Sequence, residues 1–150
     1  MSPLKIIFVC TGNTCRSPMA AALAAQIFAE SGLDVEIFSA GVSAVKGQPA
    51  SLHAIQVMKD SGLCLQSHKA SDICGEALES AGLVLTMTAS HRAILLSDYP
   101  AAEGKIFTLA GYAGDTQDVA DPFGGRLEEY RACATQIRRL LELAAKRLTQ

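Results

Sequence analysis

The sequence contains no tryptophan, few aromatic residues of any kind, and no long apolar run. None of its stretches approaches the roughly 18 apolar residues of a transmembrane helix. The longest early apolar stretch, Ile6–Cys10, is too short for the core of a signal peptide, and no cleavage site follows it. We therefore expect a cytoplasmic protein that does not associate with membranes.

An excess of positive charge is also missing. Thirteen Lys and Arg residues stand against 15 Asp and Glu residues, which gives a formal charge of −2. Because binding to nucleic acid depends on clustered basic residues that neutralise phosphates, the balance argues against general nucleic-acid binding. The five cysteines are an odd number, and without export they indicate reduced thiols rather than a disulfide framework.

What is present fits one folded unit. The chain has 150 residues, 49% of them hydrophobic, which is the size and apolar content of an ordinary globular domain. It contains no internal repeat, low-complexity tract or linker, so we expect a single domain over residues 1–150. The sequence favours a monomer without fixing the oligomeric state.

Strand-like and helix-like segments alternate along the chain. Such alternation favours a three-layer α/β/α fold around a four-stranded parallel sheet, with ligands bound beyond the carboxyl ends of the strands. The amphipathic C-terminal helix is the clearest element. Strands are expected at 4–9, 35–40, 83–85 and 106–109, helices at 17–30, 49–61, 75–81, 90–96 and 127–148, and a loop at 110–125.

The segment Cys10–Ser17 joins the first predicted strand to the first helix and has the residues of a phosphate-binding loop. A tight loop at a helix N-terminus points several backbone N–H groups at one anion, and Gly12 allows positive φ and close approach. Arg16 offers a planar fork of donors for two phosphate oxygens. These groups should hold Cys10 as a thiolate, a ready nucleophile. Ser17 either caps the helix or donates its hydroxyl to the thiolate.

The Cys-x5-Arg spacing alone carries little information, because Cys133 and Arg139 repeat it inside the C-terminal helix. Only the first copy follows a strand, contains a glycine and ends in Ser-Pro at a helix start. The plain alternative is that Cys10 is a buried strand-end thiol and Arg16 a surface charge. The context favours the phosphate-binding interpretation.

A thiolate that cleaves phosphate bonds also needs an acid for the leaving group. The predicted loop at 110–125 offers Asp115, Asp118 and Asp121. Asp121 is followed by a proline, which stiffens the backbone, and by Phe123, which is suited to wall a pocket. We take Asp121 as the candidate acid, with a solvated turn residue as the alternative.

The residues VCTGNTCRSP at 9–18 and DPF at 121–123 resemble the low-molecular-weight protein-tyrosine phosphatase family, as do SAG at 39–41 and HKA at 68–70. The similarity spans nearly all of the chain. It implies a four-stranded parallel sheet with helices on both faces. It also implies hydrolysis of phosphorylated protein substrates in two steps, with neither a metal nor another cofactor.

The resemblance also assigns roles to residues. It implies that Cys10 attacks phosphorus to form a phosphocysteine, that Arg16 stabilises the equatorial oxygens, and that Asp121 protonates the leaving group and then activates water. Asn13, together with His68, would hold the loop in shape. The predicted phosphate- and substrate-binding residues are Thr11, Gly12, Asn13, Thr14, Cys15, Ser17 and Phe123.

Three departures from the tyrosine-directed members concern the substrate. Thr14 stands where many members have a bulky aliphatic residue, Gly124 where some have a second aromatic, and Val45 near where several have tryptophan. Thr14 and the FGG segment at 123–125 resemble instead the bacterial protein-arginine phosphatase branch. There the threonine is implicated in admitting phosphoarginine and orienting the hydrolytic water. We expect phosphoarginine as the substrate, with phosphotyrosine as the alternative.

Cys15 has two interpretations. The resemblance suggests that it forms a disulfide with Cys10 under oxidation and so protects the nucleophile reversibly. The alternative is a packed thiol, and the sequence does not choose between them.

Three other functions fit the sequence less well: an arsenate reductase, a non-catalytic phosphate-binding protein, and a metal or redox module. An arsenate reductase of this fold would need relay cysteines, and the candidates Cys64 and Cys74 have unremarkable spacing. A non-catalytic phosphate-binding protein would need neither Cys10 nor Asp121.

A metal or redox module would have to use scattered cysteines and histidines. The chain has no paired Cys-x2-Cys or His-x3-His spacing, so we expect no metal site. We interpret Cys64 and Cys133 as core thiols, and His53 and His91 as residues on helix surfaces.

Overall fold

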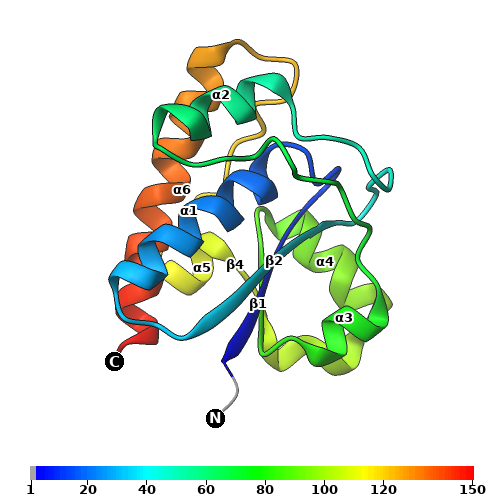
Figure 1. The fold of residues 1–150 in the computed structure, drawn as a ribbon. Coiled ribbons are helices and arrows are strands. Elements are labelled where there is room, and N and C mark those ends of the chain that lie inside the picture. The colour runs from blue at the N-terminus through cyan, green and yellow to red at the C-terminus, as the bar shows by residue number, and fades with distance from the viewer. Residues whose placement is uncertain (1–2) are drawn as a thin grey trace.

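A computed structural model describes residues 3–150 and contains one parallel sheet of four strands in the order β2-β1-β3-β4 (Figure 1). The strands are β1 (Leu4–Cys10), β2 (Val35–Gly41), β3 (Leu83–Thr86) and β4 (Ile106–Thr108). The helices are α1 (Arg16–Glu30), α2 (Leu52–Asp60), α3 (Gly75–Ser80), α4 (Ala89–Asp98), α5 (Leu109–Ala113) and α6 (Leu127–Leu148), with the 3₁₀ helix η1 (Pro100–Lys105). The predicted fold class is confirmed.

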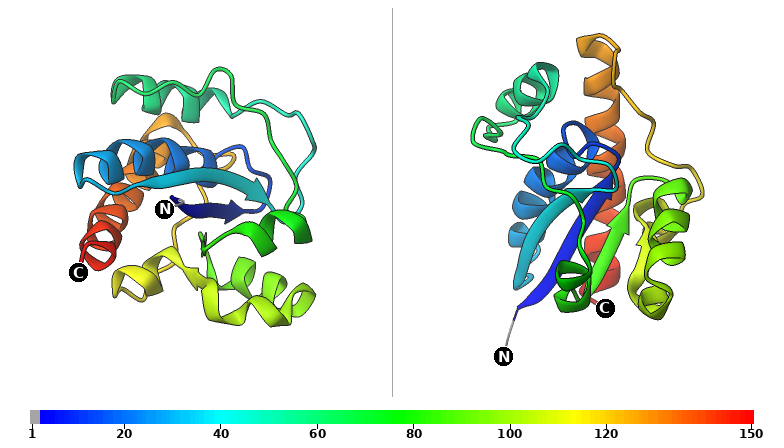
Figure 2. Two further views of the ribbon diagram at one scale, coloured as in Figure 1. Left: turned by 60° about the horizontal axis from the view of Figure 1, so that its bottom comes forward. Right: turned by 90° about the vertical axis from the view of Figure 1, so that its right-hand side faces the viewer.

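Helices cover both faces of the sheet (Figure 2). On one face α1, α5 and α6 pack over the strands, with α2 beyond them, and on the other face lie α3 and α4. Side chains of β1 alternate between the layers: Ile6, Phe8 and Cys10 belong to the core under α1 and α6, whereas Ile7 and Val9 belong to the core under α3 and α4. This alternation places the Cys10 side chain on the side of α1.

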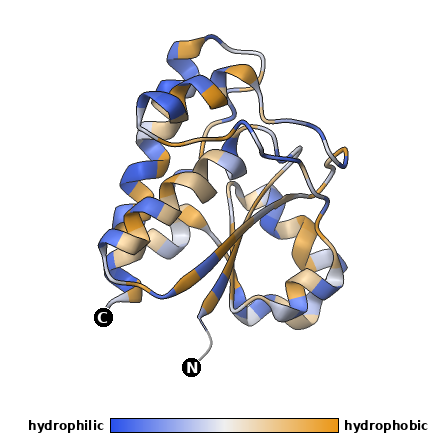
Figure 3. Cartoon of the chain, in the orientation of Figure 1, coloured by the Kyte–Doolittle hydropathy of each residue, from blue (hydrophilic) through white to orange (hydrophobic). Residues whose placement is uncertain are grey.

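The apolar patterns that predict the elements account for the packing. Strand β1 is a nearly continuous apolar run with both faces covered, as a central parallel strand requires. Apolar and polar residues alternate along helix α6 (Figure 3). Its buried stripe includes Tyr130, Ile137 and Leu141. Its bounds agree with the prediction, and those of β1 and α1 lie within one residue of it.

The predicted loop at 110–125 is wrong at its start. Leu109–Ala113 forms the short helix α5, and β4 therefore ends at Thr108 rather than Leu109. The Thr108 hydroxyl accepts a hydrogen bond from Gly111 N–H at 2.9 Å, and Gly114 ends the helix in the left-handed conformation, φ 86°. An N-cap threonine, together with a glycine C-cap five residues after the first helical residue, Leu109, is enough for a single helical turn.

Two smaller differences concern helices. The helix expected from residue 49 begins at Leu52, because Ser51 caps it by accepting from Ala54 N–H at 3.3 Å. The 3₁₀ helix η1 was not expected. Among residues 3–150, no helix is both long enough and apolar enough to cross a membrane.

Candidate active site

The predicted phosphate loop connects the carboxyl end of β1 to the first turn of α1. Cys10 is 3% exposed, and its Sγ lies 2.9 Å from the Ser17 hydroxyl oxygen. The N-cap position of α1 is Cys15, not Ser17, and no side chain caps this helix. Of the two roles expected for Ser17, the geometry therefore gives the contact with the sulfur rather than the cap.

The left-handed turn of the loop occurs at Asn13, φ 57°, and not at Gly12 as the sequence suggested. Asparagine tolerates this region because its short amide side chain bonds to nearby groups. A Cβ atom added at Gly12 would meet only the Thr14 hydroxyl, at 3.7 Å, which is an ordinary contact. The loop turns because Asn13 is held in place from several directions.

Asn13 is fully buried and uses both ends of its amide. Its Nδ2 donates to Ser17 Oγ at 2.8 Å and to Ser39 Oγ at 2.9 Å, and its Oδ1 accepts from Ser71 N–H at 3.0 Å. His68 Nε2 lies 2.7 Å from the Asn13 carbonyl oxygen. Asn13 occupies one acceptor position of the Ser17 hydroxyl, which has the Cys10 sulfur at 2.9 Å and the Ala40 carbonyl oxygen at 3.4 Å as partners for its proton, the sulfur being the nearer.

Several carbonyl groups of the loop point outward. The carbonyls of Cys10, Thr11 and Thr14 accept from the N–H groups of Val42, Ser43 and Ser51, each at 2.9 Å. In a trans peptide the following N–H points the opposite way, so these contacts turn backbone donors toward the other side of the loop. Across residues 3–150 the N–H groups at positions 12–15 have no protein acceptor. The loop therefore presents donors to an anion.

Arg16 and the candidate acid lie together. The Arg16 guanidinium is 7% exposed, donates from Nη1 to the Val119 carbonyl at 3.2 Å, and places Nη2 3.5 Å from Asp121 Oδ2. Asp121 is 55% exposed, and its Oδ1 accepts from Phe123 N–H at 3.0 Å. Phe123 is 75% exposed. The structure thus brings Asp121 to the phosphate loop, with Phe123 standing outside it.

The segment that carries Asp121, residues 114–126, is called the acid loop below. It is tied to the end of β3 by Val119 N–H, which donates to the Met87 carbonyl at 3.0 Å. Ala89 is the first residue of α4, and its N–H donates to both carboxylate oxygens of Asp118, at 3.1 and 3.2 Å. Gln136 of α6 donates to the Asp118 carbonyl at 2.9 Å. These ties position an otherwise exposed loop.

Cys15 and Thr14 form a second small group. Cys15 is buried, and its Sγ lies 3.3 Å from the Tyr130 hydroxyl, 3.5 Å from Ser51 Oγ and 3.7 Å from Thr14 Oγ1. Burial first, and then the bond with Cys15, raises the pKa of Tyr130 to about 12, so the phenol is protonated at neutral pH. Sequence reasoning identified Tyr130 only as part of the apolar stripe of α6.

His91 is buried, and its assignment to a helix surface is wrong. Its Nε2 lies 2.8 Å from Thr11 Oγ1 and its Nδ1 3.0 Å from Thr88 Oγ1. Burial, and after it the charge of Arg16, lowers the pKa of His91 to about 4, so the imidazole is neutral at pH 7. Its spacing within a short helix gave no signal of this contact with the loop.

The other cysteines divide differently from the prediction. Cys133 is buried, as expected, and burial raises the pKa of its thiol to about 12. Cys64 is exposed, so its assignment to the core is wrong. It lies in the connection that follows α2 and not within a packed helix. Cys74 is exposed at the N-cap of α3. Within the described residues, no group of three or more metal-ligating side chains occurs.

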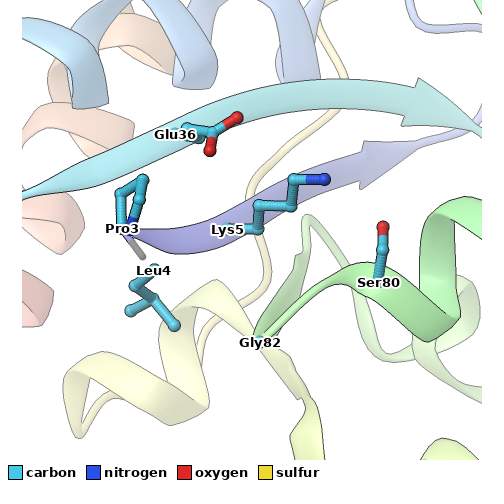
Figure 4. A pocket seen from close by; sticks show the side chains of 6 residues that line it. All are labelled: Pro3, Leu4, Lys5, Glu36, Ser80 and Gly82. Atoms are coloured by element: carbon cyan, nitrogen blue, oxygen red, sulfur yellow. The ribbon is translucent and has the colours of Figure 1, made fainter. Parts of the chain in front are cut away.

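A shallow pocket of about 610 Å³ lies at the amino ends of the strands, at the far end of β1 from Cys10 (Figure 4). Parallel sheets bind ligands at their carboxyl ends, so this position is unlike a substrate site. Its lining residues are Pro3, Leu4, Lys5, Glu36, Ser80 and Gly82.

The loop combines a buried thiol, carbonyls bonded outward, and an arginine that lies 3.5 Å from a carboxylate. This set is typical of a cysteine-dependent phosphatase on an α/β sheet. Comparison with known proteins agrees. The sequence profile of the low molecular weight phosphotyrosine protein phosphatases matches residues 5–150. The chain belongs to this family of protein phosphatases.

Individual relatives cover almost the whole chain. A protein-arginine phosphatase of Geobacillus stearothermophilus is 43% identical over 147 residues, 97% of each chain. The PtpB low molecular weight protein-tyrosine phosphatase of Staphylococcus epidermidis is 37% identical over 139 residues, 93% of this chain and 95% of that one. A solved structure of the YwlE arginine phosphatase, a cysteine-to-serine mutant with a phosphorylated active-site serine, matches with a TM-score of 0.94 and 42% identity, over 98% of this chain and 97% of that one.

Proposed function

We propose that this protein hydrolyses phosphoarginine in phosphorylated proteins. The observation that carries the proposal is Thr14 at the edge of the phosphate loop, half-buried and 3.7 Å from Cys15 Sγ. A threonine there leaves more room than a branched aliphatic residue and offers a hydroxyl for water or for a guanidinium nitrogen. The identity to a protein-arginine phosphatase over 97% of the chain supports the same substrate.

In the first step, Cys10 Sγ attacks phosphorus as a thiolate. The S–P bond forms as the P–N bond to the guanidino group breaks, and Asp121 gives its proton to the departing nitrogen. Arg16 and the loop N–H groups bind the phosphoryl oxygens on which charge develops. The Ser17 hydroxyl, 2.9 Å from the sulfur, stabilises the thiolate before attack.

In the second step, water attacks the phosphocysteine. Asp121, now a carboxylate, takes a proton from that water while the S–P bond breaks and the sulfur leaves as thiolate. Inorganic phosphate is released, and the enzyme returns to its starting state. The phosphorylated active-site serine of the YwlE mutant supports a covalent intermediate at the equivalent position.

A second candidate substrate is phosphotyrosine. The observation in its favour is the 37% identity to a protein-tyrosine phosphatase over 93% of the chain. Against it, Phe123, the aromatic residue that follows the acid motif, is 75% exposed, and the next residue is Gly124. A flat phenyl ring thus gains little packing in addition to its phosphate contacts.

The proposal also covers the domain organisation and the cellular location of the protein. We infer a single phosphatase domain over residues 1–150 that acts in the cytoplasm, where reducing conditions keep a nucleophilic thiol available. All five cysteines are free in the structure.

The test is a side-by-side assay of the native protein and Thr14→Ile on phosphoarginine and phosphotyrosine peptides of one sequence. We expect native kcat/KM to favour phosphoarginine, and Thr14→Ile to shift the ratio at least about tenfold toward phosphotyrosine, the scale of one lost hydrogen bond. Thr135→Ile, an exposed site on α6, is the matched control and should leave the ratio unchanged. An unchanged ratio in Thr14→Ile would remove the substrate assignment.

A further inference from the structure

The first turn of α4 is tied to both halves of the active site. Asp118 of the acid loop accepts from Ala89 N–H, and the Thr88 side chain caps the turn by accepting from His91 N–H at 3.2 Å. From the same turn, His91 reaches Thr11 of the phosphate loop at 2.8 Å. Thr11 and His91 are 80 positions apart in the chain, so the fold and not local sequence makes this contact.

Hydrogen bonds hold the His91 ring at both of its nitrogens. Nδ1 lies 3.0 Å from Thr88 Oγ1, and Nε2 lies 2.8 Å from Thr11 Oγ1. A neutral imidazole donates from one ring nitrogen and accepts at the other, and a threonine hydroxyl can do either, so both contacts form in either tautomer. The two bonds fix the ring between the two threonines.

Thr11 is held on two sides. Its carbonyl accepts from Ser43 N–H at 2.9 Å, and a Cβ at Gly41 would lie only 2.4 Å from that carbonyl oxygen, so the end of β2 closes against it. Its side chain is held by His91. Because the Thr11–Gly12 peptide is planar, fixing Thr11 also fixes the direction of the Gly12 N–H, one of the donors without a protein acceptor in residues 3–150.

We propose that His91 is a positioning residue for the phosphate loop. Through Thr11 it orients the Gly12 N–H, and it does so from the helical turn that also holds the acid loop. His91 thereby keeps the phosphate-binding donors in register with Asp121. This inference deepens the proposed function, because the oriented loop is the one that binds the phosphoryl group there.

The charges around His91 agree with a neutral imidazole. Arg16 faces it from α1 and disfavours the imidazolium, while Asp118 and Asp121 face it from the acid loop and oppose that effect. Burial disfavours the charge most, which keeps the pKa near 4. Protonation would make both ring nitrogens donors, so the Thr88 and Thr11 hydroxyl oxygens would both have to accept from the ring.

A double-mutant cycle between His91→Leu and Thr11→Val tests the pairing, with p-nitrophenyl phosphate as substrate. Each single change should lower kcat/KM about tenfold, as loss of one positioning hydrogen bond would. The double variant should lose about the same tenfold, because both changes remove the same bond. His91→Gln, which keeps a donor for Thr11, should recover most of the activity. His53→Leu on α2 is the matched control and should stay within about twofold of native.

A second measurement needs no turnover. In the Cys10→Ser background, calorimetry with inorganic phosphate should show about tenfold weaker binding when His91 is Leu, and nearly native binding when it is Gln. If His91→Leu loses its native circular dichroism spectrum, His91→Asn takes its place, since it keeps a partner for Thr88 but not the donor for Thr11. A hundredfold loss in the double variant, or unchanged phosphate affinity, would overturn the proposal.

These outcomes separate the two claims. Turnover that survives Cys10→Ser would sink the proposed mechanism, whereas the phosphate-binding measurement would still decide the role of His91. A native preference for phosphotyrosine peptides would change the substrate and leave the coupling between His91 and Thr11 as predicted.

Discussion

At the residue scale, the sulfur of Cys10 lies 2.9 Å from the Ser17 hydroxyl oxygen. Cys10 is part of the core between the sheet and helices α1 and α6. We predict that Cys10→Ser lowers kcat for p-nitrophenyl phosphate by at least about a thousandfold, because an alkoxide is far harder to form than a thiolate. Rapid quenching of the native enzyme followed by mass spectrometry should find one phosphoryl group on Cys10. Cys64→Ser, at an exposed thiol, is the control and should keep native activity.

Asp121 carries the second prediction. Asp121→Asn cannot donate a proton, so turnover should fall about a hundredfold or more with a poor leaving group such as phenol, and much less with nitrophenol. Steady-state kinetics on the two phosphate esters gives the comparison. Asp98→Asn, exposed at the end of α4, should change neither. Equal losses on both esters would show that Asp121 acts other than as an acid.

Single residues also mark the limit of sequence reasoning. Residue type and context predict Cys10, Arg16 and Asp121 as site residues; in the structure Arg16 lies 3.5 Å from Asp121, and Cys10 lies 2.9 Å from Ser17, the residue after Arg16. Gly12 was given the left-handed conformation that Asn13 adopts, because glycine is the default there and the partners of Asn13 come from residues 39 and 71. The sequence predicts a surface position for His91, because the phosphate loop that contacts it is 80 positions away and leaves no sign in the residues around it.

At the scale of elements, β2 and the phosphate loop approach so closely that only glycine fits at position 41. A Cβ there would lie 2.4 Å from the Thr11 carbonyl oxygen and 3.1 Å from Asn13 N. Gly41→Ala should cost about 1–3 kcal/mol of unfolding free energy and lower phosphatase activity, since backbone must move. Gly104→Ala, in η1 with no atom within 4 Å of its Cβ, is the matched control and should be near neutral. Urea titration measures both, and equal stabilities would contradict the prediction.

Elements with a long apolar period were the predictable ones. Strand β1 and helices α1 and α6 agree with the sequence to within a residue, because each buries a stripe that its spacing shows. Helix α5 was missed since five residues are too few for a period, and the glycines around it indicated a loop. The caps at Thr108 and Gly114 were the available signal.

At the scale of the whole molecule, burial of a neutral histidine links folding to pH. The pKa of His91 is about 4 when folded and 6.5 when exposed in the unfolded chain. Between these values the unfolded state binds more protons, so this histidine favours unfolding increasingly as pH falls from about 6.5 to about 4. The loss should amount to about 1–3 kcal/mol over that window. Urea titrations at several pH values measure it. His91→Gln should flatten the dependence, and an equally steep curve would contradict the assignment.

An early helix and the C-terminal helix of the described chain pack against each other. Helix α1, which begins at the phosphate loop, packs along α6, and α6 carries Tyr130, which contacts Cys15, and Gln136, which holds the acid loop. The site thus depends on the last helix as well as on the first strand.

This order along the chain matters while the protein is being made. Cys10 emerges from the ribosome more than a hundred residues before Asp121, and helix α6, which holds the acid loop through Gln136, follows later still. We expect a nascent chain to carry the proposed nucleophile without the proposed acid, and to become competent only after α6 has been synthesised.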